Sequence, residues 1–216
     1  MEIYDSDNLS MTLDEAAGVK VSIQAGELKS LVITPETFRT RQPSSYTFSF
    51  VLSNPVSPTG SISISLPPEM SVSTLSGGLT LRTLQNLATS ATITSTGNNV
   101  IQIKNCFSNQ FPSGTYIQFS IPTGLSNPYT SKQLTTPFSV STLSSSGVII
   151  DTAVGLKLQA TPNEIPQVIV TACNGDANNA VKVASQTNML CTYQLRILMS
   201  SALGITSGSY IEVEVP

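Results

Sequence analysis

Apolar and polar residues alternate along several short stretches of the chain. Every second residue is apolar in residues 46–52, 61–66, 117–121 and 211–215, and Ser, Thr, Gln or Glu occupy most positions between them. Because successive side chains of a strand point to opposite faces, this period of two predicts β-strands with one buried face. Residues 100–104 predict a further strand, and Gly-, Pro-, Asn- and Ser-rich clusters such as residues 53–60 predict turns between strands.

Helical spacing is found in residues 79–88. Leu81, Leu84 and Leu87 lie three residues apart there, which fits either a helical turn or an irregular crossover between two sheets. Short strands separated by turns about every ten residues are typical of antiparallel sandwiches. The sequence therefore predicts an all-β fold of antiparallel β-sandwich units.

Two parts of the chain match each other in order and spacing. Gly18 aligns with Gly155, and the same offset, without a gap, aligns Leu13 with Ile150. Beyond an insertion in the second copy, residues 46–50 align with residues 193–197 at a slightly larger offset. Apolar positions of one copy meet apolar residues of the other, which indicates a repeat. The aligned pairs include Asp14 with Asp151, Val19 with Leu156, Val21 with Leu158, Glu27 with Glu164, Tyr46 with Tyr193, Phe48 with Leu195, and Ile62 with Ile211.

The repeat divides the chain into three segments. A period of about 140–150 residues is the size of one large sandwich domain. Residues 1–30 then hold the closing strands of one unit, residues 31–160 a complete unit, and residues 161–216 the opening strands of the next. A partial sandwich leaves apolar faces uncovered, so they need strands from a continuing chain or from a neighbouring molecule. We favour a continuing chain, because the N-terminal segment of a second molecule lacks the middle of the unit.

Composition narrows the classes of function. Hydrophobic residues make up 40% of the 216, charged residues 11%, and Ser and Thr roughly a quarter, which fits both solvent-facing strand positions and O-glycan attachment. A net charge of −3 without a basic cluster excludes nucleic acid as a partner. No apolar stretch approaches the ~20 residues of a membrane span, and no signal-peptide pattern opens the chain, so a secretion signal or anchor is expected outside this segment.

The chain contains neither His nor Trp. Without His, a Ser-His-Asp or Cys-His catalytic centre cannot be assembled from this chain, and the commonest transition-metal ligand is missing. We therefore expect no catalytic residues, no metal site and no cofactor, and we do not expect an enzyme.

Three cysteines are candidates for covalent links. Cys173 and Cys191 flank an insertion that the complete unit lacks, and a disulfide between them would close a loop of about 19 residues and stabilise the fold by roughly 3 kcal/mol. In an extracellular protein we favour this disulfide over two buried thiols. Cys106 is then unpaired, either as a free thiol or as a bridge to a neighbouring unit or molecule.

Polar clusters suggest modification and calcium binding. Asn8 is the first residue of the sequon Asn8-Leu9-Ser10 and is therefore a candidate for N-linked glycosylation. The Ser/Thr-rich residues 89–96 are a candidate stretch for O-linked glycans. Residues 5–8 and 174–178 resemble oxygen-rich calcium loops, but Asx-rich turns explain both clusters. We favour turns, because the first cluster aligns near residues 143–146, which hold no carboxylate.

Several turn-and-strand phrases follow one another in a set order: Thr34-Pro35 before residues 46–50, then Asn54-Pro55, Leu66-Pro67, and residues 113–117, 124–128 and 145–151. In these phrases the chain resembles a family of very long, Ser/Thr-rich, immunoglobulin-like repeat proteins predicted on the surfaces of ciliates. The resemblance covers most of the chain and implies tandem immunoglobulin-like units in an extracellular coat, fibre or adhesive filament. The Cys-bearing insertion at residues 173–191 departs from that pattern.

Two hypotheses of function follow. The first is an extracellular or cell-surface structural or adhesive protein, whose partners are copies of itself or continuing repeat units that meet through strand or sheet-edge contacts. The alternative is a carbohydrate-binding β-sandwich module, which makes glycans a further candidate partner. Such modules usually stack planar aromatic rings on sugars. Because Tyr46 and Tyr193 are expected in the core, Tyr116 and Tyr129 are the remaining candidates.

Overall fold

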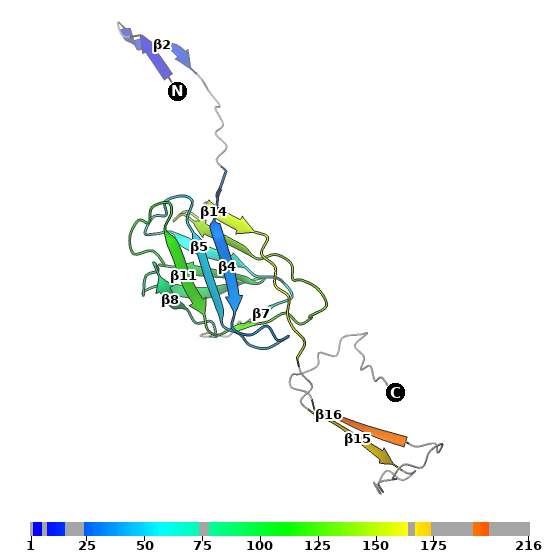
Figure 1. The fold of residues 1–216 in the computed structure, drawn as a ribbon. Coiled ribbons are helices and arrows are strands. Elements are labelled where there is room, and N and C mark those ends of the chain that lie inside the picture. Colours follow the sequence, from blue (N-terminus) through cyan, green and yellow to red (C-terminus); the bar gives the residue numbers. More distant parts are fainter. Residues whose placement is uncertain are drawn as a thin grey trace.

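The structure is a computed structural model that describes residues 2–5, 8–15, 24–73, 78–163, 167–173 and 192–198. Strands and turns form this part of the chain, and it contains no helix, so the fold is all-β (Figure 1). Residues 24–73 and 78–163 hold two large sheets and are called the central body below. Two separate two-stranded hairpins, one on either side of it in sequence, complete the described residues.

The larger sheet of the central body has six strands in the order β3-β14-β13-β6-β10-β9. Neighbouring strands are antiparallel except β3 and β14, which run parallel. The strands are β3 (Gly26–Glu27), β6 (Ser61–Ser65), β9 (Thr92–Gly97), β10 (Val100–Lys104), β13 (Ser139–Leu143) and β14 (Ile149–Val154).

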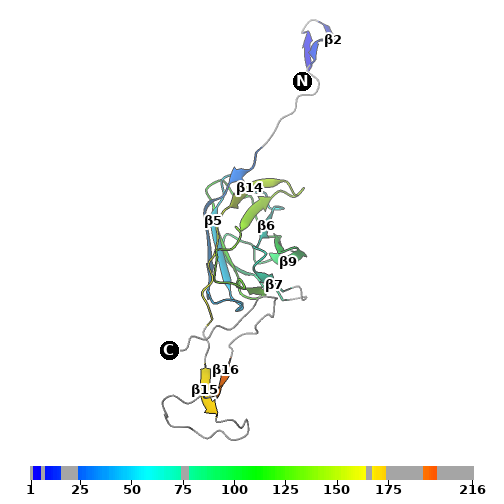
Figure 2. The same cartoon turned by 90° about the vertical axis from the view of Figure 1, so that its right-hand side faces the viewer.

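The smaller sheet has four antiparallel strands in the order β4-β5-β11-β8. They are β4 (Lys29–Pro35), β5 (Tyr46–Val51), β8 (Arg82–Gln85) and β11 (Tyr116–Ile121). A short pair, β7 (Ser71–Val72) with β12 (Leu125–Ser126), lies at one end of the body. Figure 2 shows β5 and β6, one from each large sheet, in separate layers.

One hydrophobic core takes side chains from both large sheets. In β5, buried and half-buried residues alternate, and Tyr46, Phe48 and Phe50 have no exposed surface. The ring of Phe48 stacks on that of Phe119 in β11, with centroids 5.3 Å apart. Burying one such side chain stabilises the fold by about 1.5–3 kcal/mol. The larger sheet contributes Ile62, Ile64, Ile101, Ile103 and Val140 to the same core.

The sequence pattern predicts four strands of the core correctly, whereas residues 156–158, which also alternate, form no strand. Strands lie in the stretches expected at residues 46–52, 61–66, 100–104 and 117–121, whereas residues 211–215 lie outside the described residues. The helical alternative for residues 79–88 is wrong. Backbone pairing with β11 makes Arg82–Gln85 a strand, and Leu84 is 44% exposed, so the three leucines share no buried stripe.

The chain joins the central body through β3. This strand pairs with β14, and Leu28 lies in the core, with its N–H bonded to the carbonyl of Thr152 at 3.0 Å. Strand β4 follows and crosses the boundary drawn at residues 30 and 31. Residues 26–30, which the repeat alignment assigns to the preceding segment, therefore pack with the strands of the central body.

The two hairpins are β1 (Glu2–Asp5) with β2 (Asn8–Glu15), and β15 (Gln167–Cys173) with β16 (Thr192–Leu198). Each forms a sheet of two antiparallel strands. Two-stranded hairpins alone are marginally stable in water, because they bury little apolar surface.

Candidate functional site

Among the residues that the structure describes, no three Asp, Glu, Cys or His side chains lie close enough together to hold a metal ion. The same residues include no helix with the length and apolarity to cross a membrane. Four other features bear on function: the pairing of the two hairpins, a buried carboxylate, the cysteines and a surface hollow.

Hairpin β15–β16 has the same register as β4–β5. In the central body, Ile33 lies opposite Phe48, and the residues aligned with them, Val170 and Leu195, also lie opposite each other. Three further pairs coincide under the same alignment. Val32–Ser49, Thr34–Thr47 and Pro35–Tyr46 correspond to Ile169–Arg196, Thr171–Gln194 and Ala172–Tyr193.

Hairpin β1–β2 corresponds to β13–β14 under the alignment of Gly18 with Gly155. The registers of these two pairs differ: Ile3 lies opposite Asp14, whereas the aligned residue Val140 lies opposite Ala153, two positions beyond Asp151, and irregularities on either side of Tyr4 change the difference toward the turn. The common register is therefore limited to β4–β5 and β15–β16.

Asp151 is a carboxylate with no exposed surface. Its Oδ2 accepts hydrogen bonds from the N–H groups of Ser53 and Asn54, both at 3.0 Å, and its Oδ1 accepts one from the side-chain amide of Asn54 at 2.7 Å. Burial of a carboxylate is costly unless donors compensate for the lost water. These three donors tie β14 to the turn that follows β5.

The same carboxylate contacts the strand by which the chain enters the body. Gly26 lies opposite Asp151 in the parallel pair β3–β14. A Cβ at Gly26 would clash with Asn54 Nδ2 and Asp151 Oδ1, so a larger residue there would displace these two hydrogen-bonded side chains. The hydroxyl of Ser53 donates to the carbonyl of Glu27. Gly26, Ser53, Asn54 and Asp151 are called the junction cluster below.

The junction cluster was only partly visible in the sequence. Asp151 aligns with Asp14, and Asn54-Pro55 is one of the phrases of the family resemblance. Nothing in the sequence pattern pairs Asp151 with Asn54, which lies 97 residues away along the chain. Only the folded sheets bring the three segments together.

Tyr46 packs in the core, as its position at the start of a strand predicts. Its hydroxyl donates to Oδ1 of Asn127, whose own amide donates to the carbonyls of Thr37 and Arg39 at 2.7 and 2.8 Å. Burial raises the pKa of the Tyr46 hydroxyl. Tyr116 is half-buried in β11.

Cys106 is a free thiol in the core. Its Sγ lies 3.6 Å from the carbonyl of Ile103 and 3.7 Å from that of Gly60, and burial raises its pKa to about 12. Of the two alternatives for this residue, the structure describes the free thiol. A bridge to another molecule would require the core to open, because the thiol has no exposed surface.

The other modification sites lie at the limits of the described residues. The backbone of Cys173 lies opposite that of Thr192, the chain neighbour of Cys191; Cys191 itself lies outside the described residues. Asn8 is the first residue of β2 and lies opposite Asp5. Of the two Asp/Asn clusters, residues 6, 7 and 174–178 lie outside the described residues.

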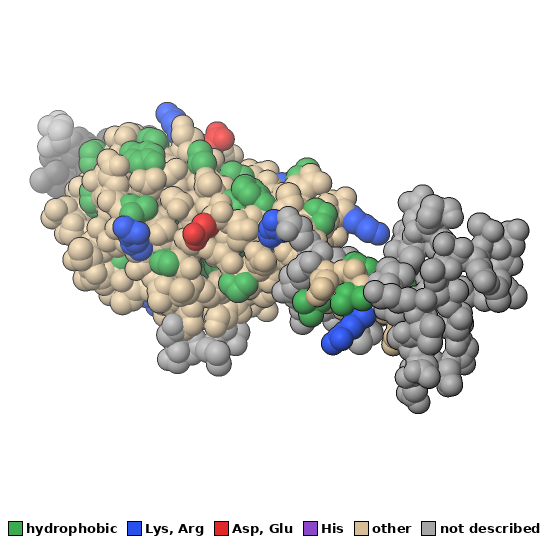
Figure 3. Space-filling model, turned by 60° about the horizontal axis from the view of Figure 1, so that its bottom comes forward, with side chains coloured by type: hydrophobic (Ala, Val, Ile, Leu, Met, Phe, Trp, Pro, Cys, Tyr) green, Lys and Arg blue, Asp and Glu red, His purple; other side chains and the backbone are tan. Residues whose placement is uncertain are grey.

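The candidate O-glycan stretch at residues 89–96 includes most of the edge strand β9. Thr92, Thr94 and Thr96 are exposed there, and Ile93 is half-buried. Figure 3 shows a few charged side chains scattered over one face of the molecule, with hydrophobic side chains, uncharged polar side chains and backbone between them.

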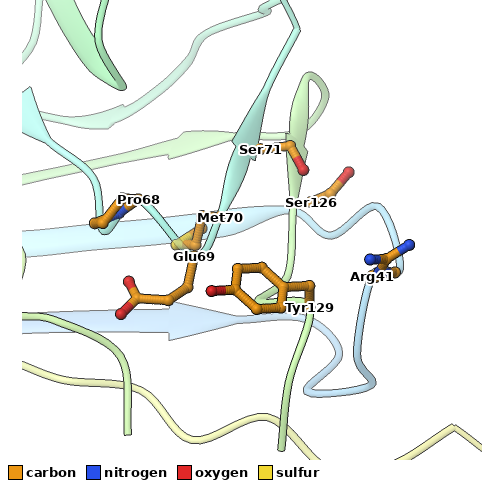
Figure 4. Close-up of a pocket in the computed structure, with 7 residues that line it drawn as sticks. All are labelled: Arg41, Pro68, Glu69, Met70, Ser71, Ser126 and Tyr129. Atoms are coloured by element: carbon orange, nitrogen blue, oxygen red, sulfur yellow. The ribbon is translucent and has the colours of Figure 1, made fainter. Parts of the chain in front are cut away.

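A surface hollow of about 490 Å³ lies beside the short pair β7–β12 (Figure 4). Tyr129, one of the two tyrosines that remained candidates for sugar binding, lines it and is 56% exposed. Arg41 and Glu69 lie on either side of Tyr129 in the close-up. The sequence gives no sign of this grouping, because the three residues come from three separate loops.

No protein-family model matches the chain, and no curated protein matches it.

Proposed function

We propose that the chain is a segment of an extracellular structural or adhesive protein built from tandem immunoglobulin-like β-sandwich units. The resemblance to Ser/Thr-rich ciliate surface proteins and the scarcity of charged residues both favour this proposal. The observation that carries it is the common register of β4–β5 and β15–β16. Copies of the chain, or further units, are the partners that such an array requires.

The register supports a repeat for a physical reason. Side chains of a strand alternate between faces, so a slip of one residue would exchange the buried and exposed positions of the whole strand. The two hairpins share few identical residues, yet four aligned pairs lie opposite each other in both. Equal spacing of inward positions in two weakly similar segments is what repeated units have in common.

The proposed role is mechanical. In the central body, β3 carries the chain in and is hydrogen-bonded to β14, the last strand of the larger sheet along the chain. The junction cluster joins these two strands to the turn after β5 through hydrogen bonds to the buried Asp151 carboxylate and to the carbonyl of Glu27. Tension on the chain would thus act on a strand pair that the core and a satisfied polar cluster both support.

Cysteine cross-linking tests the register in the chain itself. With Cys173 and Cys191 replaced by Ser, the pairs T34C/T47C and T171C/Q194C should both oxidise readily, because directly opposite Cα atoms lie within disulfide reach. The pair T171C/R196C, displaced by two positions on the same face, is the matched control. Efficient oxidation of the control with none of T171C/Q194C would remove the observation that carries the proposal.

Electron microscopy of native material tests the array. Filaments or surface fibrils identified with antibodies against residues 24–163 should show a regular repeat of about one sandwich unit along their length. Labelled single particles, dispersed and without regular spacing, would contradict the proposal.

A further inference from the structure

The hollow beside β7–β12 collects groups from three loops of the central body. Arg41 comes from the β4–β5 loop, Glu69 from the segment before β7, and Tyr129 from the segment after β12. Its volume of about 490 Å³ is within the ~300–1,000 Å³ typical of small-molecule sites.

Tyr129 offers a flat apolar surface in this hollow. Tyr129 as a whole is 56% exposed, and its ring lies between the Glu69 carboxylate and Arg41 in Figure 4. The N–H of Tyr129 donates to the carbonyl of Glu69 at 3.2 Å, which fixes the backbone that carries the ring. An exposed aromatic face is a surface on which an amphipathic ring can stack.

Glu69 is held as a hydrogen-bond acceptor. Its Oε1 accepts from the N–H of Thr136 at 3.1 Å and its Oε2 from the hydroxyl of the same residue at 3.0 Å. Each carboxylate oxygen has two lone pairs, so both oxygens keep one for a ligand. The carboxylate is therefore oriented before any ligand arrives, which lowers the entropic cost of binding.

Two hydroxyl groups and one cationic side chain also line the hollow. Ser71 and Ser126 lie opposite each other in the β7–β12 pair and bring two hydroxyls to the same side of the hollow. The guanidinium of Arg41 carries five N–H donors in a planar fork. Acceptor, donor and hydroxyl groups thus surround one aromatic ring.

We propose that this hollow binds a neutral sugar residue of a glycan. The C–H face of a pyranose packs on Tyr129, two of its hydroxyls donate to Glu69, and a further hydroxyl oxygen accepts from Arg41. A sugar ring matches the site because it is apolar on its face and carries hydroxyls around its edge. A neutral sugar fits better than an acidic one, since the fixed Glu69 carboxylate repels a second negative charge. The site lies within the central body and does not depend on a tandem array.

Binding of the 216-residue chain to an array of neutral and sialylated glycans, followed by calorimetry with the best neutral glycan, tests the assignment. Tyr129→Ala and Glu69→Gln should each weaken binding by about tenfold or more. Tyr129→Phe keeps the stacking face and should stay within about threefold. The matched control is Phe38→Ala, which removes a 45% exposed aromatic ring from the same β4–β5 loop as Arg41 but outside the hollow.

Three outcomes would overturn the site. They are the absence of any neutral-glycan binding, binding that Tyr129→Ala leaves unchanged, and an equal loss of affinity in Phe38→Ala. Circular dichroism of each variant shows whether the body remains folded, and Glu69→Gln keeps the test decisive if the alanine variant unfolds. None of these outcomes changes the spacing seen by electron microscopy, so the sugar site and the array fail separately.

Discussion

Hairpins β4–β5 and β15–β16 pair their residues alike but differ in what covers them. Phe48 in β5 has no exposed surface, whereas the aligned Leu195 in β16 is 39% exposed. On the opposite face the two hairpins resemble each other, because Val32 is 50% and the aligned Ile169 41% exposed. The two hairpins therefore differ in how exposed their inward-facing side chains are, and they agree on the outward face.

The difference separates what a hairpin specifies from what a unit adds. Register follows from local alternation and strand pairing, and both hairpins have it. Burial of the inward face requires the further strands β11 and β8 and the opposing sheet, which surround β5. Removing inward side chains should therefore cost far more in the first hairpin than in the second.

The largest expected effect is at Phe48. Phe48→Ala should lower the free energy of unfolding by about 3–5 kcal/mol, because it empties a closed core position and removes the stack on Phe119. Leu195→Ala, at the aligned position, should lower it by less than about 1 kcal/mol. Urea unfolding followed by near-ultraviolet circular dichroism measures both values. Equal losses of unfolding free energy at the two positions would contradict the inference that Phe48 is covered by a core and Leu195 is not.

A second effect distinguishes the aligned aspartates. Asp151→Asn turns one acceptor of the junction cluster into a donor that faces other donors, so we expect a loss of about 2–3 kcal/mol in the same unfolding experiment. Asp14→Asn lies in hairpin β1–β2, outside both sheets of the central body, and should change its stability by less than about 0.5 kcal/mol. A large effect of Asp14→Asn would mean that β1–β2 supports the body directly.

The features of this comparison that depend on local sequence could be predicted. The alternation at residues 46–52 predicts β5 and its buried face, and the aligned positions match the pairing seen in both hairpins. Strand β8 was not predicted, because the spacing of Leu81, Leu84 and Leu87 fits a helical turn or an irregular crossover and the strand pairing depends on contact with β11.

Long-range contacts account for what the sequence leaves open. Asp151 receives its donors from residues almost a hundred positions away. Arg41, Glu69 and Tyr129 come from three loops and form no motif. Such groupings depend on how the sheets stack, and one unaligned sequence has no local pattern that records this.

A smaller effect is expected at the aligned tyrosines. Tyr46→Phe leaves Oδ1 of the buried Asn127 without its donor, so unfolding should become easier by about 1–2 kcal/mol. Tyr193→Phe should change the free energy of unfolding by less than about 0.5 kcal/mol, because β16 pairs with one strand, β15. Thermal melts of the two variants in parallel provide the measurement. An equal loss of stability in Tyr193→Phe and Tyr46→Phe would mean that further strands pack against β16 and bury Tyr193.

The smallest expected effect on stability, and the clearest chemical one, concerns the three cysteines. Only the thiolate reacts with iodoacetamide, and burial raises the pKa of Cys106 to about 12, so the native thiol should resist labelling at pH 8. With Cys173 and Cys191 joined as proposed, intact mass should show no label on the native chain. It should show one label after unfolding in urea and three after unfolding with a reductant. Two labels on the native chain would place free thiols in the C-terminal segment and exclude the disulfide, while leaving the protection of Cys106 in the body intact.

The raised pKa of Cys106 also makes stability depend on pH. Because folding raises this pKa above its value in the unfolded chain, the free energy of unfolding should decline as the pH rises above about 9.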